Sequence, residues 1–288
     1  MRKDNILTFA LLCVFHDWTF SVDSTAVNPH RHRRDPYGTD QTVQLSIVHD
    51  SVDDMYSSCT QKTLEKLNTY LSSETNIDGI FKRAWSKAES CAEDVENRFK
   101  KDNSEYNSAE LAHDHIKAIC AYSAGEPKIH DEFNKAVLSE KDEYKTSFQF
   151  HSLHFLLTDA LRLLKKQQQG CHNTFRRTKN HFKGEVNKEI RFGFFASSST
   201  DKGHSTFGDK SCFEIETCFG ADLKSYPKLG NHEKEVLIPP YEVFKVTDVL
   251  KKENNQNLWC DVVYKLESIK TLSNLNCEMF KTISNEEN

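Results

Sequence analysis

The chain contains neither a Gly-x-Gly-x-x-Gly loop nor a Walker loop, and only 10 of its 288 residues are glycine. Nucleotide binding through a Rossmann or P-loop fold therefore has no support. It has no Cys-x-x-Cys pair, and its 13 histidines lack a metal-ligand spacing, so we expect no metal site. A net charge of −5 and a pI of about 6.2 give no reason to expect nucleic-acid binding.

The N-terminus has the layout of a secretory signal. Arg2 and Lys3 precede a short apolar run, Ile6–Phe15. This run is too short to span a bilayer, which needs roughly 20 apolar residues. The run shows no helical periodicity, which argues against an ordinary buried helix. We expect a signal over residues 1–26, because small residues suited to cleavage follow at Ser21, Ser24 and Ala26.

Cysteine usage agrees with export. Nine cysteines are present and Cys13 lies in the expected signal, which leaves eight, an even number typical of disulfides in secreted proteins. Residues 280–288 are polar, so we expect no membrane anchor and no signal for a lipid anchor. The expected location is secreted and extracellular.

Residues 27–56 form a linker or a propeptide. Arg31, Arg33 and Arg34 make an Arg-x-Arg-Arg cluster, which in an exported protein can be a proprotein-convertase site that releases a mature chain near Asp35. A solvated basic linker explains the cluster equally well. Both interpretations stay open at this point.

Residues 57–170 have a helical pattern, and residues 171–288 have a strand pattern. Apolar side chains between Phe81 and Phe99 recur every three or four positions, Asn107 and Glu110 match a helix-capping pair, and Phe148–Gln169 is a further helix. Short runs rich in Val, Ile, Phe and Tyr follow after Cys171. Helices followed by strands favour an α+β fold, in one compact domain over 57–288.

Three polar motifs in the second half could carry chemistry, although each is weak alone. Glu233 and Glu235 face the same side of an extended segment, roughly 7 Å apart, but most such pairs are solvated strand edges. Ser197 opens a hydroxyl cluster at the end of an apolar run, where serines also form turns. Arg176 follows an aromatic residue and is well shaped for phosphate, yet most such arginines are surface charges.

In this order the motifs resemble the arginine-specific ecto-ADP-ribosyltransferase family, which is defined by an Arg–Ser–Glu-x-Glu constellation. The chain matches in Cys171 with Arg176 five positions later, in Arg-Phe-Gly-x-Phe-Ala-Ser-Ser-Ser over 191–199, and in the block from Glu233 to Phe244. The resemblance covers roughly Val43 to Cys277. It implies a helical subdomain followed by a mainly antiparallel β-sandwich core that binds NAD and transfers ADP-ribose to arginine side chains, releasing nicotinamide.

The resemblance also implies roles for the three motifs. Glu235 would stabilise the oxocarbenium-like cation formed as the nicotinamide–ribose bond breaks. Ser197 would hold Glu235 and the ribose in register, and Arg176 would clamp the phosphates of NAD. Relatives often have Gly where this chain has Arg177, so that side chain either points away from NAD or adds a second phosphate contact.

Glu233 would recruit the acceptor arginine, since a protonated guanidinium is not a nucleophile until a base takes its proton. In the loop before it, Tyr226 is a candidate contact with the acceptor protein, with loop packing as the alternative. The family disulfides correspond to Cys59–Cys277 and Cys171–Cys218. Among the other four cysteines the expected pairs are Cys91–Cys120 and Cys212–Cys260, although the sequence leaves their pairing open.

Two other functions remain at this stage. An NAD glycohydrolase would use water in place of arginine, through the same cation. A secreted binding protein could keep the fold without turnover, but Arg176, Ser197 and Glu235 are all intact. The expected partners are NAD and an arginine-bearing protein, and the protein is expected to be a monomer.

Overall fold

The computed structural model describes residues 36–38, 41–101, 111–124, 126–203, 205–223, 226 and 234–281. The expected signal over 1–26, the Arg31–Arg34 cluster, the Asn107–Glu110 pair and Glu233 lie outside these residues. Predictions about them therefore stay predictions.

Helices come first along the described chain. The apolar stripe from Phe81 to Phe99 forms one face of the second helix, and the expected helix at Phe148–Gln169 runs from His151 to Gln167. The helices are α1 (Thr60–Asn76), α2 (Ile80–Lys101), α3 (His113–Ser123), α4 (Ile129–Ser139) and α5 (His151–Gln167).

Strands follow the helices, apart from the short β1. Eight of them form one sheet in the order β4-β9-β10-β6-β2-β5-β8-β7, and β1 pairs with β3 in a second sheet. The strands are β1 (Thr42–Gln44), β2 (His172–Thr178), β3 (His181–Lys183), β4 (Glu189–Ile190), β5 (Ala196–Ser199), β6 (Ser211–Thr217), β7 (Ala221–Asp222), β8 (Glu235–Ile238), β9 (Glu242–Lys251) and β10 (Val262–Thr271), with short 3-10 turns η1 (Ser205–Phe207) and η3 (Glu278–Phe280).

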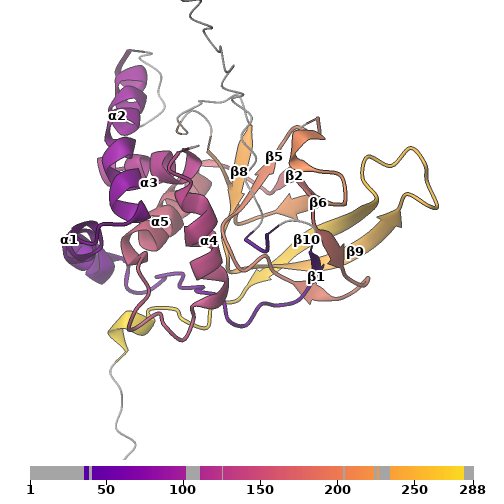
Figure 1. Ribbon diagram of the computed structural model, residues 1–288, viewed down its shortest axis with the longest axis horizontal. Coiled ribbons are helices and arrows are strands. Elements are labelled where there is room, and N and C mark those ends of the chain that lie inside the picture. The colour runs from indigo at the N-terminus through magenta and orange to yellow at the C-terminus, as the bar shows by residue number, and fades with distance from the viewer. Residues whose placement is uncertain are drawn as a thin grey trace, which may run out of the picture. The chain divides into compact units, whose positions relative to one another are not determined.

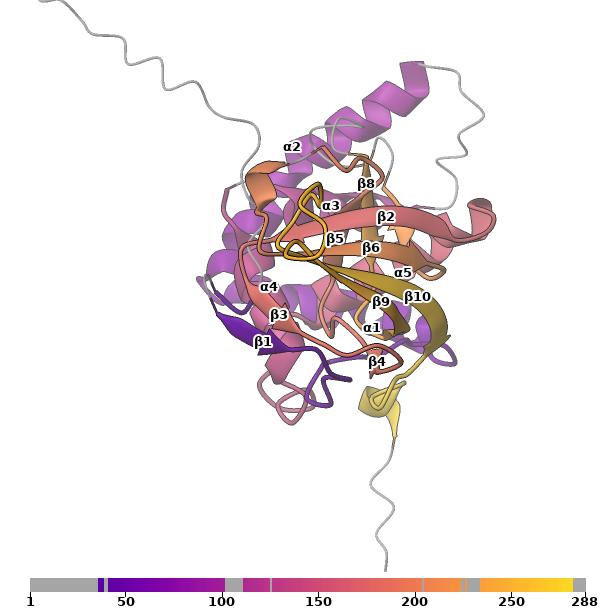
Figure 2. The ribbon, with the colours of Figure 1, turned by 90° about the vertical axis from the view of Figure 1, so that its right-hand side faces the viewer.

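The larger sheet is mainly antiparallel. Among its described strands β6 and β10 pair in parallel, and the other neighbouring pairs are antiparallel. The helices gather on one side of the strands in Figure 1, and Figure 2 looks onto the strands with the helices behind them. The expected α+β class, with helices first and a mainly antiparallel sheet after them, is confirmed.

Helix α5 lies at the centre of the packing. Its apolar residues face several directions, as expected of a helix surrounded by protein, and Phe155, Leu156 and Leu157 are completely buried. Next to it the rings of Phe133 and Phe195 stack with centroids 5.5 Å apart, which joins α4 to the segment that leads into β5. The helical half thereby supports the strand that carries Ser197.

The two ends of the described chain are tied together at two points. A disulfide joins Cys59 to Cys277, the pair that the family resemblance implies. Beside it the fully buried Arg191 pairs with Asp53 at 2.7 Å and also donates to the carbonyl oxygen of Leu272 at 2.9 Å. Because the charge of Arg191 is neutralised and hydrogen-bonded, its burial is tolerated.

Three more disulfides join segments within the described chain. Cys171 pairs with Cys218, the second pair implied by the family. The remaining pairs are those expected from the sequence, Cys91 with Cys120 between α2 and α3, and Cys212 with Cys260 between β6 and the loop before β10.

Candidate active site

Three neighbouring strands bring the polar motifs together. Arg176 lies on β2, Ser197 on β5 and Glu235 at the start of β8, and these strands are adjacent in the order β2-β5-β8. The register places Phe175 opposite Ser199 and Ser199 opposite Glu235. Residues that are far apart in the sequence therefore meet through strand pairing.

Arg176 is held in a mostly apolar setting. Its side chain is buried, with the residue 8% exposed, and Nη1 donates a hydrogen bond of 2.7 Å to the carbonyl oxygen of Ser197. The guanidinium carbon lies 5.5 Å from the ring centroid of Phe194 and 6.0 Å from that of Phe192. The aromatic segment before β5 thus positions the cation against the hydroxyl cluster.

A pocket opens at this junction, with about 520 Å³ of empty space when the open solvent at its mouth is included. Its walls combine two aromatic rings, cations, hydroxyls and a carboxylate, a mixture suited to a ligand with rings, sugars and phosphates. The lining residues are Phe175, Arg176, Arg177, Ser197, Ser198, Ser199, Asp201, Lys202, Phe207 and Glu235.

Glu235 reaches this pocket from a sharply bent entry into β8. The residue is 4% exposed, and its main-chain carbonyl accepts a hydrogen bond from the Leu223 amide at 2.9 Å. Lys234, just before it, has φ of 45°, in the left-handed region that non-glycine residues seldom adopt. Such conformations occur preferentially at functional sites.

Arg177 makes a different set of contacts from Arg176. Its guanidinium donates to the carbonyl oxygens of Lys202, Gly208 and Trp259 and lies 4.6 Å from the indole centroid of Trp259. Burial lowers the pKa of this guanidinium below its ordinary value. A contact between Arg177 and phosphate stays a prediction.

Tyr226 is buried, with 4% of its surface exposed. Its ring packs against Phe99 of α2 with centroids 5.0 Å apart, and its amide donates to the carbonyl of Leu223 at 3.0 Å. These contacts correspond to the packing role weighed as an alternative in the sequence. A contact with an acceptor protein stays a prediction.

Glu242 is a buried structural residue of the Pro-Pro block whose role was not expected from the sequence. Its buried carboxylate accepts hydrogen bonds from Thr217 Oγ1 at 2.6 Å, the Cys218 amide at 2.8 Å and the Phe219 amide at 3.2 Å. Burial raises the pKa of Glu242. The sequence signal that could have pointed to Glu242 is a single carboxylate inside the apolar run Pro-Pro-Tyr-Glu-Val-Phe. The role of Glu242 is to brace the turn that bears Cys218.

Potential metal ligands gather at two places in the part of the chain that the structure describes. One group is Asp54 with Cys59 and Cys277, and the other is Glu216 with Cys171 and Cys218. The cysteines in both groups are already joined in disulfides, so they cannot supply thiolate ligands. No helix in the described part of the chain combines the length and apolar character needed to cross a membrane.

Comparison with known proteins points to one family. The family model for NAD:arginine ADP-ribosyltransferase matches residues 45–268. The chain is 33% identical over 258 residues to the erythroblast NAD(P)(+)–arginine ADP-ribosyltransferase of Gallus gallus, covering 86% of this chain and 80% of that one. It is 31% identical over 254 residues to ecto-ADP-ribosyltransferase 4 of Homo sapiens, covering 84% of this chain and 75% of that one.

Solved structures similar to this chain belong to the same family. The crystal structure of the eukaryotic mono-ADP-ribosyltransferase ART2.2 superposes with a TM-score of 0.67 at 29% identity, covering 82% of this chain and 98% of that one. A mutant of ART2.2 in complex with NAD matches with a TM-score of 0.65, also at 29% identity and with the same coverage. The chain therefore belongs to the NAD:arginine ADP-ribosyltransferase family.

Proposed function

We propose that this protein transfers ADP-ribose from NAD to arginine side chains of an acceptor protein, and that the pocket between β2, β5 and β8 is where transfer occurs. One observation carries the proposal: Arg176, Ser197 and Glu235, which match the family motif residue by residue, line a single pocket. The names of the relatives, with NAD(P)(+)–arginine ADP-ribosyltransferase among them, support NAD as the donor.

The reaction breaks the bond between the nicotinamide nitrogen and C1′ of the ribose. Nicotinamide leaves as a neutral molecule with the bonding electrons, and the ribose becomes an oxocarbenium-like cation. Glu235, buried at the pocket wall, would stabilise that cation by its negative charge and by a hydrogen bond from the 2′-hydroxyl. Ser197 would orient the ribose and the Glu235 carboxylate.

Arg176 would bind the two phosphates of NAD. A guanidinium offers several donors in one plane, and the hydrogen bond from Nη1 to the Ser197 carbonyl orients that plane in advance. Preorganisation of this kind lowers the entropy lost when the ligand binds.

Glu233 would complete the reaction with the acceptor. A guanidinium nitrogen attacks C1′ to form the new bond between carbon and nitrogen, and its proton passes to the Glu233 carboxylate. We also assign Tyr226 to the loop that faces the acceptor, although its buried ring fits a supporting role.

The location proposed for the protein is outside the cell, in secreted form. Four disulfides among the described residues are typical of proteins in oxidising compartments, and the name of the human relative identifies an ecto-enzyme. We further propose that it acts as a monomer and that residues 57–170 and 171–288 function as one domain. The Cys59–Cys277 bridge between the two parts supports this.

Incubation of the purified protein with labelled NAD and agmatine tests the proposal. Agmatine carries a guanidinium, so a transferase yields ADP-ribosylagmatine and nicotinamide in equal amounts. An NAD glycohydrolase yields free ADP-ribose without the adduct, and a binding protein without turnover leaves NAD intact. Either of the last two results contradicts the proposal.

A further inference from the structure

A tryptophan from a distant hairpin packs against residues that line the pocket. Trp259 lies in the loop between β9 and β10, next to Cys260, and the disulfide to Cys212 fixes this loop on β6. Both cysteines are completely buried. The ring of Trp259 meets the ring of Phe175, which lines the pocket, with centroids 6.1 Å apart in an edge-to-face arrangement.

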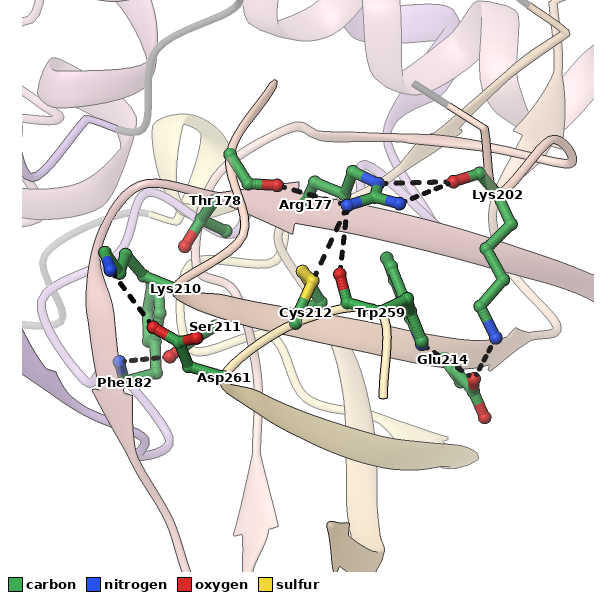
Figure 3. Close-up of a disulfide and its surroundings, with 12 residues drawn as sticks. Arg177, Thr178, Phe182, Lys202, Lys210, Ser211, Cys212, Glu214, Trp259 and Asp261 are labelled. Atoms are coloured by element: carbon green, nitrogen blue, oxygen red, sulfur yellow. Dashed lines mark hydrogen bonds and ion pairs between the residues drawn. A yellow bond between two sulfur atoms is a disulfide. The ribbon is translucent and has the colours of Figure 1, made fainter. Parts of the chain in front are cut away.

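Two cations and a carboxylate hold the indole in place. The guanidinium carbon of Arg177 lies 4.6 Å from the indole centroid, and Nζ of Lys202 lies 4.8 Å from it, both within the range of cation–π attraction. Indole Nε1 donates to Glu214 Oε1 at 3.2 Å, and the same oxygen accepts from Lys202 Nζ at 2.9 Å. We call Arg177, Lys202, Glu214 and Trp259 the Trp259 cluster, which Figure 3 displays.

Arg177 uses most of its donors on main-chain oxygens. Nε and Nη2 donate to the carbonyl of Lys202 at 3.2 and 3.1 Å, and Nη1 donates to the carbonyls of Trp259 at 3.3 Å and Gly208 at 3.4 Å. A guanidinium has only five N–H donors. In Figure 3 its planar end points at Lys202 and at the Trp259 carbonyl.

Two of the carbonyls that Arg177 binds, those of Lys202 and Gly208, belong to the stretch of chain that forms one wall of the pocket. Lys202 and Phe207 both line the pocket, and Gly208 follows directly after Phe207. Gly208 has φ of 122°, and a Cβ there would lie 2.4 Å from the main chain of Thr178 at the end of β2. Glycine at position 208 thus allows one end of this stretch to contact β2 closely. Arg177, which lies on β2, holds the other end, at Lys202, to the same strand.

We propose that Arg177 and Trp259 are positioning residues of the NAD pocket. They hold Lys202 and Phe207 at the pocket wall, and the Cys212–Cys260 disulfide holds Trp259 where it supports Arg177. Arg177, which is itself part of the pocket lining, acts by holding these neighbours in place and does not bind phosphate. This inference rests on the proposed function, because it takes NAD to be the ligand of the pocket.

Lysine at position 177 separates the two roles. Carbonyl oxygens take all but one of the five N–H donors of Arg177, so a phosphate contact by Arg177 would rest on charge and not on a planar set of donors as at Arg176. Arg177→Lys retains that charge, but an ammonium cannot donate in one plane to carbonyls of three segments. A positioning role therefore predicts that Arg177→Lys loses affinity for NAD, while a charge contact predicts that most of the affinity is kept.

The experiment measures NAD affinity by calorimetry in the Glu235→Gln background, so that NAD is not consumed. Arg177→Lys and Trp259→Ala are each expected to bind NAD about tenfold more weakly, and Trp259→Phe is expected to recover most of the affinity. Lys252→Ala, an exposed change in the same hairpin, serves as the matched control and should bind normally. In the otherwise unchanged enzyme, Arg177→Lys should raise KM for NAD and leave kcat within about twofold.

Coupling between the two residues provides a readout that a general loss of stability would not give. If both residues act through the same wall, the double variant binds NAD no more weakly than the single variant with the lower affinity. If their contacts were independent, the two losses of binding free energy would add. Normal affinity of Arg177→Lys, or additive losses, overturns the inference alone. Absence of NAD binding with an intact Trp259 cluster overturns the proposed function and this inference with it.

Discussion

The guanidinium of Arg176 donates a hydrogen bond of 2.7 Å from Nη1 to the main-chain carbonyl of Ser197. This bond connects two of the three motif residues through the main chain of β5, so the arginine is positioned by the strand that carries the serine. Because the oxygen involved belongs to the backbone, a change of the Ser197 side chain would leave it in place. The orientation of the phosphate-binding group and the position of the hydroxyl cluster are thereby coupled.

Replacement of Arg176 by lysine should weaken NAD binding. A lysine ammonium cannot hold the Ser197 carbonyl and two phosphates with the same planar set of donors, so we expect KM for NAD to rise roughly 10- to 100-fold. Steady-state kinetics at varied NAD concentration measures this. Arg83→Lys on the exposed side of α2 is the control, and equal KM values for the two variants would argue against a phosphate role for Arg176.

The meeting of Arg176, Ser197 and Glu235 at one pocket could be predicted from the sequence. The apolar runs around Arg176, Ser197 and Glu235 indicated strands, and the family order placed them at one site. The contacts of Glu242 and Arg177 could not be predicted in the same way. Their partners belong to turns and to a distant hairpin, and long-range packing of this kind leaves no periodic signal in a single sequence.

Removal of the Glu233 carboxylate should change the acceptor and preserve cleavage of NAD. In Glu233→Gln we expect transfer to agmatine to fall at least about 10²-fold, since the base for the guanidinium is lost, while slow release of nicotinamide continues with water as the acceptor. Separation of ADP-ribosylagmatine from free ADP-ribose by chromatography gives both rates. Glu253→Gln, an exposed change in the β9–β10 hairpin, should alter neither, and an equal fall of both rates in Glu233→Gln would refute the assignment.

The buried ion pair of Asp53 and Arg191 should contribute strongly to stability. Both side chains are fully buried, so Asp53→Asn leaves an uncompensated cation and should lower the free energy of unfolding by about 3–5 kcal/mol. Glu189→Gln breaks an exposed pair with Lys270 and should cost less than about 1 kcal/mol. Urea denaturation compares the two variants, and similar losses would contradict the structural role of the buried pair.

His154 should make stability depend on pH. It is completely buried, its Nδ1 lies 2.9 Å from the Tyr56 hydroxyl, and burial lowers its pKa to about 3. The unfolded chain binds a proton near pH 6.5 and the folded chain does not, so the free energy of unfolding falls as pH falls from 6.5 towards 3. The slope from this one group is about 1.4 kcal/mol per pH unit.

His154→Gln removes this titration and keeps an amide that can donate to the Val52 carbonyl, the partner of His154 Nε2 at 3.0 Å. Unfolding free energies of the two proteins should therefore converge as the pH is lowered. The buried Asp54, whose pKa is raised to about 6 by burial, is present in both proteins, so the difference isolates His154. If the difference in unfolding free energy between the two proteins stays constant between pH 6.5 and 4.5, His154 does not titrate in this way.

In the proposed mechanism Glu235 stabilises the cation formed when the nicotinamide–ribose bond breaks. Nicotinamide release by Glu235→Gln in the presence of saturating NAD and agmatine tests it most directly, with NAD affinity measured in parallel. If Glu235 has this role, kcat falls at least about 10²-fold while the affinity for NAD stays within a few-fold of that of the unsubstituted protein. Unchanged kcat in Glu235→Gln would contradict it and place the reaction at another site.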